Sequence, residues 1–350
     1  MKQFKNIMDF LKVFSSEEIC NNFLKDILWG KKVKPQEQHK FTVASLFAGV
    51  GGIDLAFQNA GFQIEWANEI DKQACETYSN NFTHKIICDD IKNLDTSLLS
   101  KVDILTGGFP CQAFSIAGHR KGFDDERGSL VFELLRVVKE LMPRVVFLEN
   151  VKNLKSHSEG KTLQHIISAF EKIGYTVKIE VMNACEYSHI PQNRERVYII
   201  CFKNEKDANK FHFPSKSNKR LQIQDLIDNE TDNSFYYKHT KYYNQLKEVM
   251  TNKNTVYQWR RQYVRENKNN LCPTLTANMG TGGHNVPLII DNKDIRKLTP
   301  RECARFQGFP ESFTLPTNLP KSALYKQMGN SVCVPVVEAI AKNILAILKA

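Results

Sequence analysis

VDILTGGFPCQ, residues 102–112, begins as an apolar run and ends in two glycines, a phenylalanine, a proline, a cysteine and a glutamine. Residues 102–106 are typical of a buried strand, and the glycines and proline that follow predict a sharp turn. Such a turn places Cys111 at the carboxyl end of a strand, where open α/β sheets bind their ligands. A single cysteine is more often a small buried hydrophobic residue, but this setting indicates a thiol presented to a ligand.

Upstream of this stretch, a glycine-rich turn at residues 48–52 separates a predicted strand at 41–47 from a predicted helix at 53–60. The order strand, glycine-rich loop and helix is typical of the start of a nucleotide-binding domain. Asp54 stands where a dinucleotide-binding loop has its third glycine, which disfavours NAD. No P-loop lysine follows the glycines, which disfavours ATP.

Acidic residues follow the next two predicted strands, at residues 62–67 and 85–88. Glu69 comes about 20 residues after Gly49, the spacing at which an acidic side chain binds ribose hydroxyls. Asp90 follows the second of these strands, where an acid suits an adenine amino group. Either acid alone would more often be a helix cap. Together with the glycine-rich turn, they favour an adenosine cofactor without phosphates.

A further buried strand is predicted at residues 144–148, with Glu149 at its carboxyl end. Cys111 and Glu149 would then end two successive strands of one parallel sheet and face one pocket. Without that partner, an acid at this position would be interpreted as the neighbour of a helix N-cap.

Arg194 and Arg196 lie in the extended segment that leads into a predicted strand at residues 197–202. Two residues that are two apart on an extended segment share one face. Arginines in such a place anchor a phosphate or orient a carboxylate. A solvated surface pair is the common alternative, and the entry into a buried strand argues against it.

The pattern changes at residue 203, where strand–helix alternation fades and Asn, Lys and Tyr become frequent. Basic residues interleaved with Tyr and Trp at 238–268 suit phosphate contacts and base stacking, although an ordinary surface has a similar composition. Regular structure returns at residue 296. A helix is predicted to begin at Pro300 with Thr299 as its N-cap, and an apolar helix at 334–348 is expected in the core.

Composition limits the class of protein. The chain has 350 residues, of which 42% are hydrophobic and 25% charged, as in folded globular proteins. Its net charge of +10 favours a polyanionic partner such as nucleic acid. The nine cysteines include no Cys-x-x-Cys pair, which indicates a reducing cytosol and argues against disulfides and structural zinc. We expect no signal peptide, and no membrane span because Glu338 and Lys342 interrupt the most hydrophobic run.

Several motifs together resemble those of the DNA (cytosine-5) methyltransferase family. They are FAGVGG from Phe47, GFPCQ from Gly108, ENV from Glu149, QNRER from Gln192, RFQGFP from Arg305 and GNS from Gly329. The resemblance covers residues 41–202 and 296–344 and is of the bacterial restriction–modification type. It implies an α/β fold with a Rossmann-like, S-adenosylmethionine-dependent methyltransferase domain, in which the C-terminal helix folds back beside the first strand. It also implies a smaller, mostly irregular or β target-recognition domain.

The resulting domain layout has four segments. We expect an N-terminal helical appendage at 1–40, a catalytic and cofactor-binding domain at 41–202, a target-recognition domain at 203–295, and a return to the catalytic domain at 296–350.

The resemblance also assigns site residues. The catalytic residues would be Cys111, Glu149, Arg194 and Arg196. S-adenosylmethionine would be bound by Phe47, Gly49, Gly51, Glu69, Ile70, Asp90, Ile91, Pro110, Leu130, Asn330 and Ser331. DNA would be contacted by Gln112, Ser115, Arg127, Thr274 and Leu275. No metal is implied.

The proposed chemistry begins with addition of the Cys111 thiolate to C6 of a flipped-out cytosine. Glu149 would bind N3 and the exocyclic amine, Arg196 would reach O2, and Arg194 would orient its neighbours. The product of the cofactor would be S-adenosylhomocysteine.

The expected partner is double-stranded DNA, with a monomeric enzyme, a cognate restriction endonuclease and a bacterial cytoplasmic, nucleoid-associated location. The alternatives are an RNA cytosine methyltransferase on the same fold and a catalytically silent DNA-binding regulator. A cysteine hydrolase would need a histidine base, for which His119 is the nearest in sequence.

Overall fold

The computed structural model describes residues 40–110, 130–260, 263–281 and 285–350. Phe41–Ala350 form one compact unit. Some predicted features lie outside the described residues. They are the N-terminal appendage up to residue 39, the nucleophile candidate Cys111, and Gln112, Ser115 and Arg127 of the loop that follows it.

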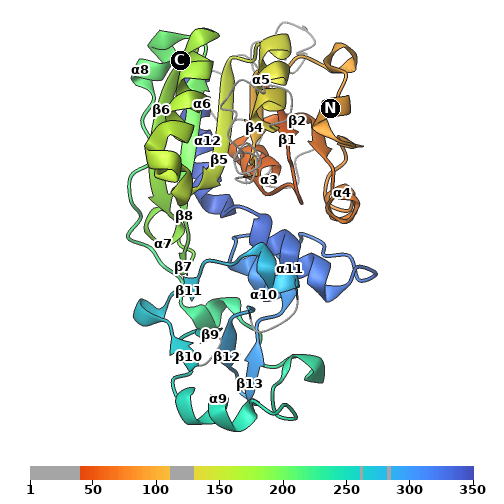
Figure 1. Cartoon of the computed structure of the whole chain (residues 1–350), viewed down its shortest axis with the longest axis vertical. Helices are drawn as coiled ribbons and strands as arrows, with labels where there is room; N and C mark the ends of the chain where they lie inside the picture. Colours follow the sequence, from red (N-terminus) through yellow and green to blue (C-terminus); the bar gives the residue numbers. More distant parts are fainter. Residues whose placement is uncertain (1–39, 111–129, 261–262, 282–284) are drawn as a thin grey trace, which may run out of the picture. The chain divides into compact units, whose positions relative to one another are not determined.

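A seven-stranded sheet organises the larger part of this unit, in the order β3-β2-β1-β4-β5-β8-β6 (Figure 1). Its strands are β1 Thr42–Leu46, β2 Gln63–Glu69, β3 Lys85–Cys88, β4 Ile104–Gly107, β5 Val145–Val151, β6 Thr176–Asn183 and β8 Glu195–Phe202. The first five strands of the spatial order are parallel, and β8 is antiparallel to both β5 and β6. Because the chain order reverses between β1 and β4, a ligand crevice is expected at their carboxyl ends.

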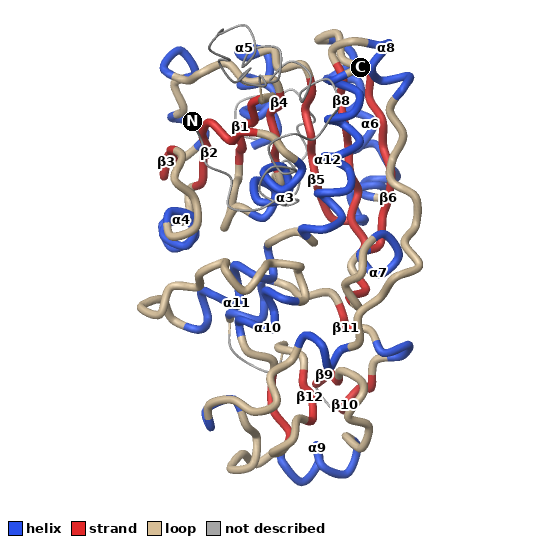
Figure 2. The backbone as a smooth tube through the Cα atoms, turned by 180° about the vertical axis from the view of Figure 1, so that it is seen from behind, coloured by secondary structure: helices blue, strands red, loops and turns tan. Residues whose placement is uncertain are grey.

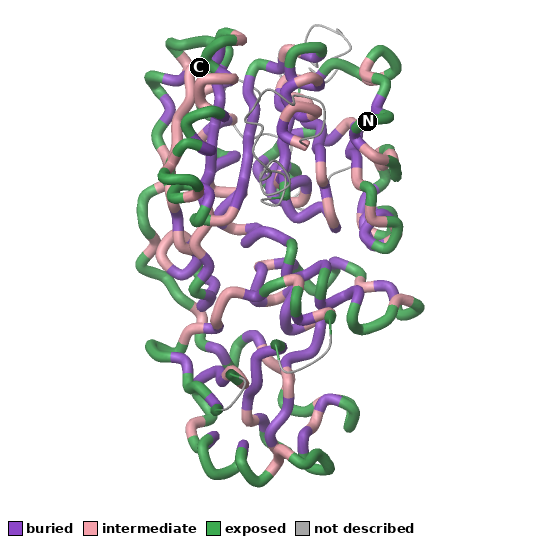
Figure 3. The backbone as a smooth tube through the Cα atoms, viewed as in Figure 1, coloured by how far each residue is buried: buried purple, intermediate pink, exposed green. Residues whose placement is uncertain are grey.

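Helices cover both faces of this sheet (Figure 2). One face packs against α3 Gly52–Ala60, α4 Lys72–Ser79 and α12 Val334–Lys349, and the other against α5 Leu130–Leu141 and α6 Lys161–Lys172. Successive strand residues alternate between the two layers, as strand geometry requires. Phe147 packs in the layer of α3 and α12, for example, and Leu148 in that of α5 and α6. The central strands are therefore buried, whereas the edge strand β6 is only half-buried (Figure 3).

The predicted strands are present, with shifts in several of their bounds; β2, for example, runs on to Glu69. The strand predicted at 85–88 coincides with β3. However, β5 runs on to Val151, so Glu149 lies inside the strand and not after it, and Arg196 likewise lies inside β8. Both residues take part in the β5–β8 ladder, where Glu149 pairs with Tyr198 and Val151 with Arg196. A polar residue that faces a pocket interrupts the apolar pattern of the sequence, but the strand itself continues past that residue. The predicted bounds are therefore too short.

The predicted recognition segment contains a second, four-stranded antiparallel sheet in the order β10-β9-β12-β13. Its elements are β9 Tyr257–Arg260, β10 Tyr263–Glu266, β12 Leu288–Ile290, β13 Ile295–Lys297 and the helix α9 Tyr243–Val249. A separate small core of this sheet includes Leu246, Tyr257 and Leu288. Residue 295, the predicted end of the segment, falls inside β13.

Several short elements lie outside the two large layers. They are α7 Ala184–Tyr187, β7 Gln192–Asn193, α8 Glu205–Lys210 and β11 Cys272–Pro273. Strands β7 and β11 pair in parallel, so the chain just before Arg194 lies beside the chain just before Thr274.

The C-terminal segment begins with α10 Pro300–Arg305, followed by α11 Lys321–Asn330 and α12. Thr299 is the N-cap of α10, as predicted. Its hydroxyl accepts from the Glu302 N–H at 3.1 Å, and the Glu302 carboxylate accepts from the Thr299 N–H at 2.7 Å. This reciprocal capping box satisfies two backbone donors at the helix start. The helix ends at Arg305, and Gly308 adopts a positive φ of 79° in the turn that follows.

One expectation about membranes needs correction. The segment Lys321–Lys349, which holds α11 and α12, is long and apolar enough to cross a membrane by length and composition, with a mean hydropathy of 1.8 over an 18-residue window, although we expected no such run. Half of the apolar window is buried inside the protein. Helix α12 buries Val337, Ile340 and Ile344 in the same core as α3. These contacts are those of a core helix.

Candidate active site

A cavity of about 810 Å³ lies at the carboxyl ends of β1, β2, β4 and β5. Many predicted site residues line it together: Phe47, Gly49, Glu69, Ile70, Asp90, Ile91, Pro110, Leu130, Glu149, Arg194, Arg196, Asn330 and Ser331. They come from the predicted catalytic domain and from the C-terminal segment. Three predicted residues, Gly51, Thr274 and Leu275, do not line this cavity.

The glycine-rich turn forms one wall of the cavity. Phe47 and Gly49 both have positive φ values, 54° and 58°, which bend the chain sharply after β1. A Cβ atom at Gly49 would meet nothing within 4 Å. Gly51 has a different role, because a Cβ there would lie 2.3 Å from the Phe82 ring. Gly51 is therefore required for packing at the start of α3, and not as part of the cavity wall.

Glu69 holds the opposite side of that turn. One carboxylate oxygen, Oε2, accepts from the Gly49 N–H at 2.7 Å, and Oε1 accepts from the N–H groups of Ile70 and Asp71, both at 2.9 Å. The side chain of Ile70 is 63% exposed, which is unusual for an isoleucine and gives the cavity an apolar surface. Asp90 caps the turn after β3 by accepting from the Lys92 N–H at 3.0 Å.

These residues fit an adenosine-containing cofactor with a polar tail. Carboxylates that already accept backbone N–H groups keep further lone pairs for hydroxyl or amino donors. The Ser331 hydroxyl is buried at the cavity and has no hydrogen-bond partner among the described residues, so it is available to a ligand. Within the described ranges, no group of three or more His, Cys, Asp or Glu side chains is arranged to hold a metal ion.

Glu149 and Arg196 form an ion pair in the cavity wall, with Nε of Arg196 2.9 Å from Oε1 of Glu149. Their side chains are only 12% and 11% exposed, so water screens the pair weakly. The turn that leads to Cys111 approaches the same carboxylate, because a Cβ at Gly108 would lie 3.8 Å from Oε2 of Glu149. Next to Glu149, Asn150 donates to the Phe109 carbonyl at 2.9 Å and fixes that turn.

Arg194 differs from Arg196 because it is 2% exposed and, among the described residues, its guanidinium donates to backbone carbonyls alone. It donates to Leu275 O at 2.8 Å, to Gly329 O at 3.3 Å and to Ser331 O. Burial and the nearby Arg196 lower the pKa of the Arg194 guanidinium to about 9, so it is charged at neutral pH. These contacts support the expectation that Arg194 orients its neighbours.

A buried polar cluster joins three elements that end at the cavity. Asp54 at the start of α3 is fully buried, and its Oδ1 accepts from the Ser45 hydroxyl at 2.5 Å. Ser45 of β1 lies 2.6 Å from the Thr106 hydroxyl of β4. Burial raises the pKa of the Asp54 carboxyl to about 7, and the hydrogen bond from Ser45 offsets part of this rise.

Sequence reasoning missed some of the cavity residues. Lys326 of α11 pairs with Asp71, at 2.8 Å between Nζ and Oδ2, and both line the cavity. They are 255 positions apart in the chain, so no local pattern could have linked them. Asn150 had a usable signal, because it is a second polar residue directly after a buried strand and Glu149.

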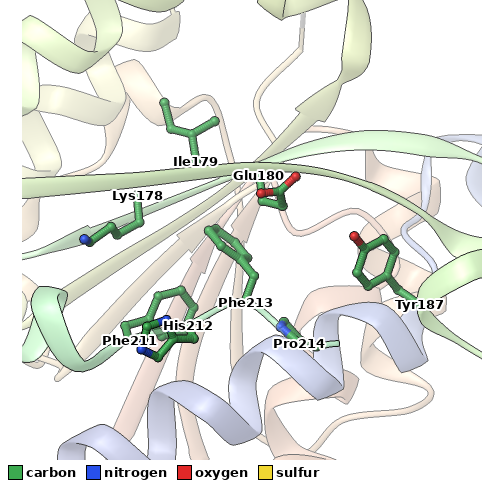
Figure 4. A pocket seen from close by; sticks show the side chains of 8 residues that line it. All are labelled: Lys178, Ile179, Glu180, Tyr187, Phe211, His212, Phe213 and Pro214. Atoms are coloured by element: carbon green, nitrogen blue, oxygen red, sulfur yellow. The ribbon is translucent and has the colours of Figure 1, made fainter. Parts of the chain in front are cut away.

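A second cavity, of about 450 Å³, lies along the edge strand β6 (Figure 4). Its lining includes Lys178 and Glu180 of β6, Tyr187 of α7, and Phe213. None of the predicted site residues lines it. The cavity at the carboxyl ends of the parallel strands is therefore the candidate active site.

Comparison with known proteins agrees with this arrangement. The sequence model of the C-5 cytosine-specific DNA methylase family matches residues 41–346. The chain is 54% identical to type II methyltransferase M.Bsp6I of Bacillus sp. (strain RFL6) over 308 residues, which cover 86% of this chain and 98% of that protein. It is 38% identical to M.HhaI of Haemophilus parahaemolyticus, over 89% of this chain and 97% of the relative.

Two solved structures share the fold at low sequence identity. The Entamoeba histolytica methyltransferase EhMeth has a TM-score of 0.70 at 18% identity, and S. pombe Dnmt2 has a TM-score of 0.67 at 19% identity. Each comparison covers 89% of this chain and the whole of the other.

The chain thus belongs to the family of C-5 cytosine-specific DNA methylases. Its enzymatic activity is that of a DNA (cytosine-5-)-methyltransferase, on the Rossmann-like fold described above.

Proposed function

We propose that the enzyme methylates C5 of one cytosine within a short, specific sequence of double-stranded DNA. The observation that carries this proposal is the convergence of three features on one cavity. Glu149 and its partner Arg196 line it, the 108–110 turn that precedes Cys111 borders it, and the acidic side chain of Glu69 lies at its other end.

Cys111 is the nucleophile in this proposal. Cytosine C5 becomes nucleophilic only when a bond forms at C6, because addition there turns the ring into an enamine. The Cys111 sulfur forms the bond to C6, and the electron pair of the C5–C6 double bond becomes available at C5. After methylation, a base takes the proton from C5 and the C–S bond breaks, which restores the aromatic ring and frees the thiolate.

Glu149 and Arg196 bind the reacting base. The Glu149 carboxyl group holds N3 and the exocyclic amine, where charge changes during addition. The guanidinium of Arg196 reaches O2 of the base while it keeps the Glu149 carboxylate in place. The short distance between the two side chains and their low exposure support these roles.

S-adenosylmethionine supplies the methyl group as an electrophilic sulfonium and leaves as S-adenosylhomocysteine. We assign its ribose to Glu69, its adenine to the Ile70 and Asp90–Ile91 side of the cavity, and its amino-acid end to Asn330 and Ser331. The remaining proposed contacts are Phe47, Gly49, Pro110 and Leu130. The buried, unpartnered hydroxyl of Ser331 supports this orientation. Gly51 is proposed to act indirectly, through packing of the turn.

Target recognition is assigned to residues 203–295, with 1–40 as an appendage and 296–350 as the return to the catalytic part. Bases inside a duplex are out of reach, so the cytosine must flip out. We assign the closing contacts to Gln112, Ser115 and Arg127. Thr274 and Leu275 are proposed to meet the DNA at the end of the recognition segment. Thr274 directly follows β11, which pairs with β7, and its hydroxyl donates to the Asn193 carbonyl. Leu275 is fully buried, so we propose that its contribution is to fix the backbone of this loop.

The biological role proposed is protection of host DNA alongside a cognate restriction endonuclease, by a monomeric, nucleoid-associated cytoplasmic enzyme. The names of the type II relatives support this context.

Sequencing of 5-methylcytosine in DNA from an expressing, methylation-deficient bacterial host tests the proposal. We expect 5-methylcytosine at one short sequence motif and nowhere else, and none when the host expresses the Cys111→Ser variant. Unmethylated host DNA, together with methylated tRNA from the same cells, would contradict the proposed substrate.

A further inference from the structure

Three buried side chains connect the predicted DNA-contacting element to the predicted cofactor-binding element. We call residues 274–277 the recognition loop, residues 329–331 the cofactor loop, and Gln192, Arg194 and Gln307 the connector. The connector residues are 0–2% exposed, so all of their polar atoms are withdrawn from bulk water. Buried polar groups of this kind are usually satisfied within the protein; in the connector, Nε of Arg194 is an exception, with no hydrogen-bond partner among the described residues.

The connector binds the recognition loop through the backbone of one residue, Leu275. Oε1 of Gln192 accepts from the Leu275 N–H at 3.2 Å, and Arg194 donates to the Leu275 carbonyl at 2.8 Å. Next to it, the Thr274 hydroxyl donates to the Asn193 carbonyl at 2.6 Å. Both backbone groups of Leu275 are thus held by side chains from β7 and from Arg194, the residue that follows it.

The same side chains hold the cofactor loop. Arg194 donates to the carbonyls of Gly329 and Ser331. Nε2 of Gln307 donates to the Met328 carbonyl at 2.7 Å, just before this loop, and lies 3.5 Å from the Ser331 carbonyl. Nε2 of Gln192 lies 3.2 Å from Oε1 of Gln307, which closes a continuous ring of hydrogen bonds. The ring runs from the recognition loop through the connector to the cofactor loop and back.

The two loops are also in direct backbone contact. A Cβ at Gly329 would lie 2.1 Å from the carbonyl carbon of Thr276 and 2.4 Å from the Ala277 nitrogen. No side chain fits between the loops, so a displacement of one must displace the other. Interiors packed in this way transmit shifts instead of absorbing them.

From this arrangement we propose that the connector couples binding of DNA to binding of the cofactor. Contact of DNA with the recognition loop fixes the position of Leu275. Through its hydrogen bonds, the connector then also fixes the positions of the Gly329 and Ser331 carbonyls. Gln192, Arg194 and Gln307 are positioning residues in this mechanism. The inference rests on the proposed roles of the two loops, and thermodynamic linkage makes the coupling reciprocal.

The test measures the dissociation constant of S-adenosylhomocysteine by calorimetry, with and without the shortest unmethylated duplex that the wild-type enzyme methylates. The ratio of the two constants is the coupling factor, which we expect to be roughly fivefold or more for the wild type. Arg194→Lys keeps the charge but loses the guanidinium fork. Gln307→Met keeps the volume but loses both hydrogen-bonding groups. We expect both variants to lower the factor toward one.

Tyr175→Phe is the matched control, because it also removes a buried hydrogen bond to a carbonyl, that of Pro143 at 2.7 Å, away from the cavity. Its coupling factor should equal that of the wild type. A wild-type factor of one, or an unchanged factor in both connector variants, overturns the coupling even if methyl transfer proceeds. Absence of methyl transfer by the wild-type enzyme would instead overturn the proposed function.

Discussion

Nε of Arg196 in β8 lies 2.9 Å from Oε1 of Glu149 in β5, and the pair crosses the antiparallel junction of these two strands. The junction is where the parallel part of the sheet ends. Because both side chains are almost hidden from water, loss of one partner leaves the other charge poorly solvated. The pair therefore fixes the carboxylate that we assign to the cytosine ring.

Glu149→Gln should lower kcat by roughly 10²–10³-fold, because the isosteric amide cannot transfer a proton to N3, where negative charge develops as the thiolate adds to the ring. DNA binding should change little, since the side chain lies within the cavity wall. Single-turnover kinetics with a gel-shift measurement of DNA affinity checks both values. A variant with wild-type kcat would remove Glu149 from the chemistry.

Glu69→Gln should weaken binding of S-adenosylmethionine about tenfold or more. The two oxygens of Glu69 accept three backbone N–H groups, so an amide nitrogen in either position faces a donor. The turn at Gly49 and the proposed ribose contact are then lost together. Calorimetry without DNA measures the effect. Glu65→Gln, on the same strand and outside the cavity, is the control, and equal affinities for the two variants would show that Glu69 has no cofactor role.

Asp54→Asn should change the pH dependence of stability. The native Asp54 carboxyl has a pKa of about 7 against a usual 3.8, so the native state binds more protons than the unfolded state between these values. The free energy of unfolding of the wild type should therefore fall as pH rises from about 4 to 7, by on the order of 4 kcal/mol at most. In the Asn variant this carboxyl group is absent, so its free energy of unfolding should not show this fall with pH. Urea unfolding at several pH values measures the difference, and parallel profiles for both proteins would contradict the assignment.

Arg296→Met should destabilise the protein by about 3–5 kcal/mol. The Arg296 side chain is fully buried and pairs with Asp291 at 2.5 Å and with both oxygens of Glu302 at 2.7 and 2.8 Å. Its removal leaves two buried carboxylates without a cation. Adding Glu302→Gln to the variant should recover part of the loss in urea unfolding. A single variant within about 1 kcal/mol of the wild type would show that the ion pairs contribute little.

The sequence predicted the parallel strands well, because their apolar runs are short and bounded by glycines or acids. It did not predict that β8 runs antiparallel, since strand direction depends on the whole path of the chain. The resemblance implied a partly β recognition segment, but the individual strands around Tyr257 were not located in the sequence, because each is only three or four residues long. The burial of Arg296 was not predicted, because only its ion pairs with Asp291 and Glu302 explain it.

The cavity residues were predicted in part because motifs near strand ends share one edge of the sheet. Gly51 was assigned to the cofactor with its neighbours, whereas its position is fixed by Phe82. The contacts between Leu275, Arg194 and the cofactor loop join segments far apart in the chain. No periodicity or spacing in the sequence contains such contacts, so they required the structure.

The central claim, that Cys111 attacks the target cytosine, is tested most directly by trapping the enzyme on DNA that contains 5-fluorocytosine. Fluorine at C5 cannot leave as a proton does, so the final elimination is blocked and the Cys111–C6 bond persists. Mass spectrometry of the digested complex should find the nucleotide on the peptide that contains Cys111, only when S-adenosylmethionine is present. Cys111→Ser should form no complex, because a hydroxyl is far less ionised than a thiol. A complex attached to another residue, such as the exposed Cys88, or no complex with the wild-type enzyme, would contradict the account.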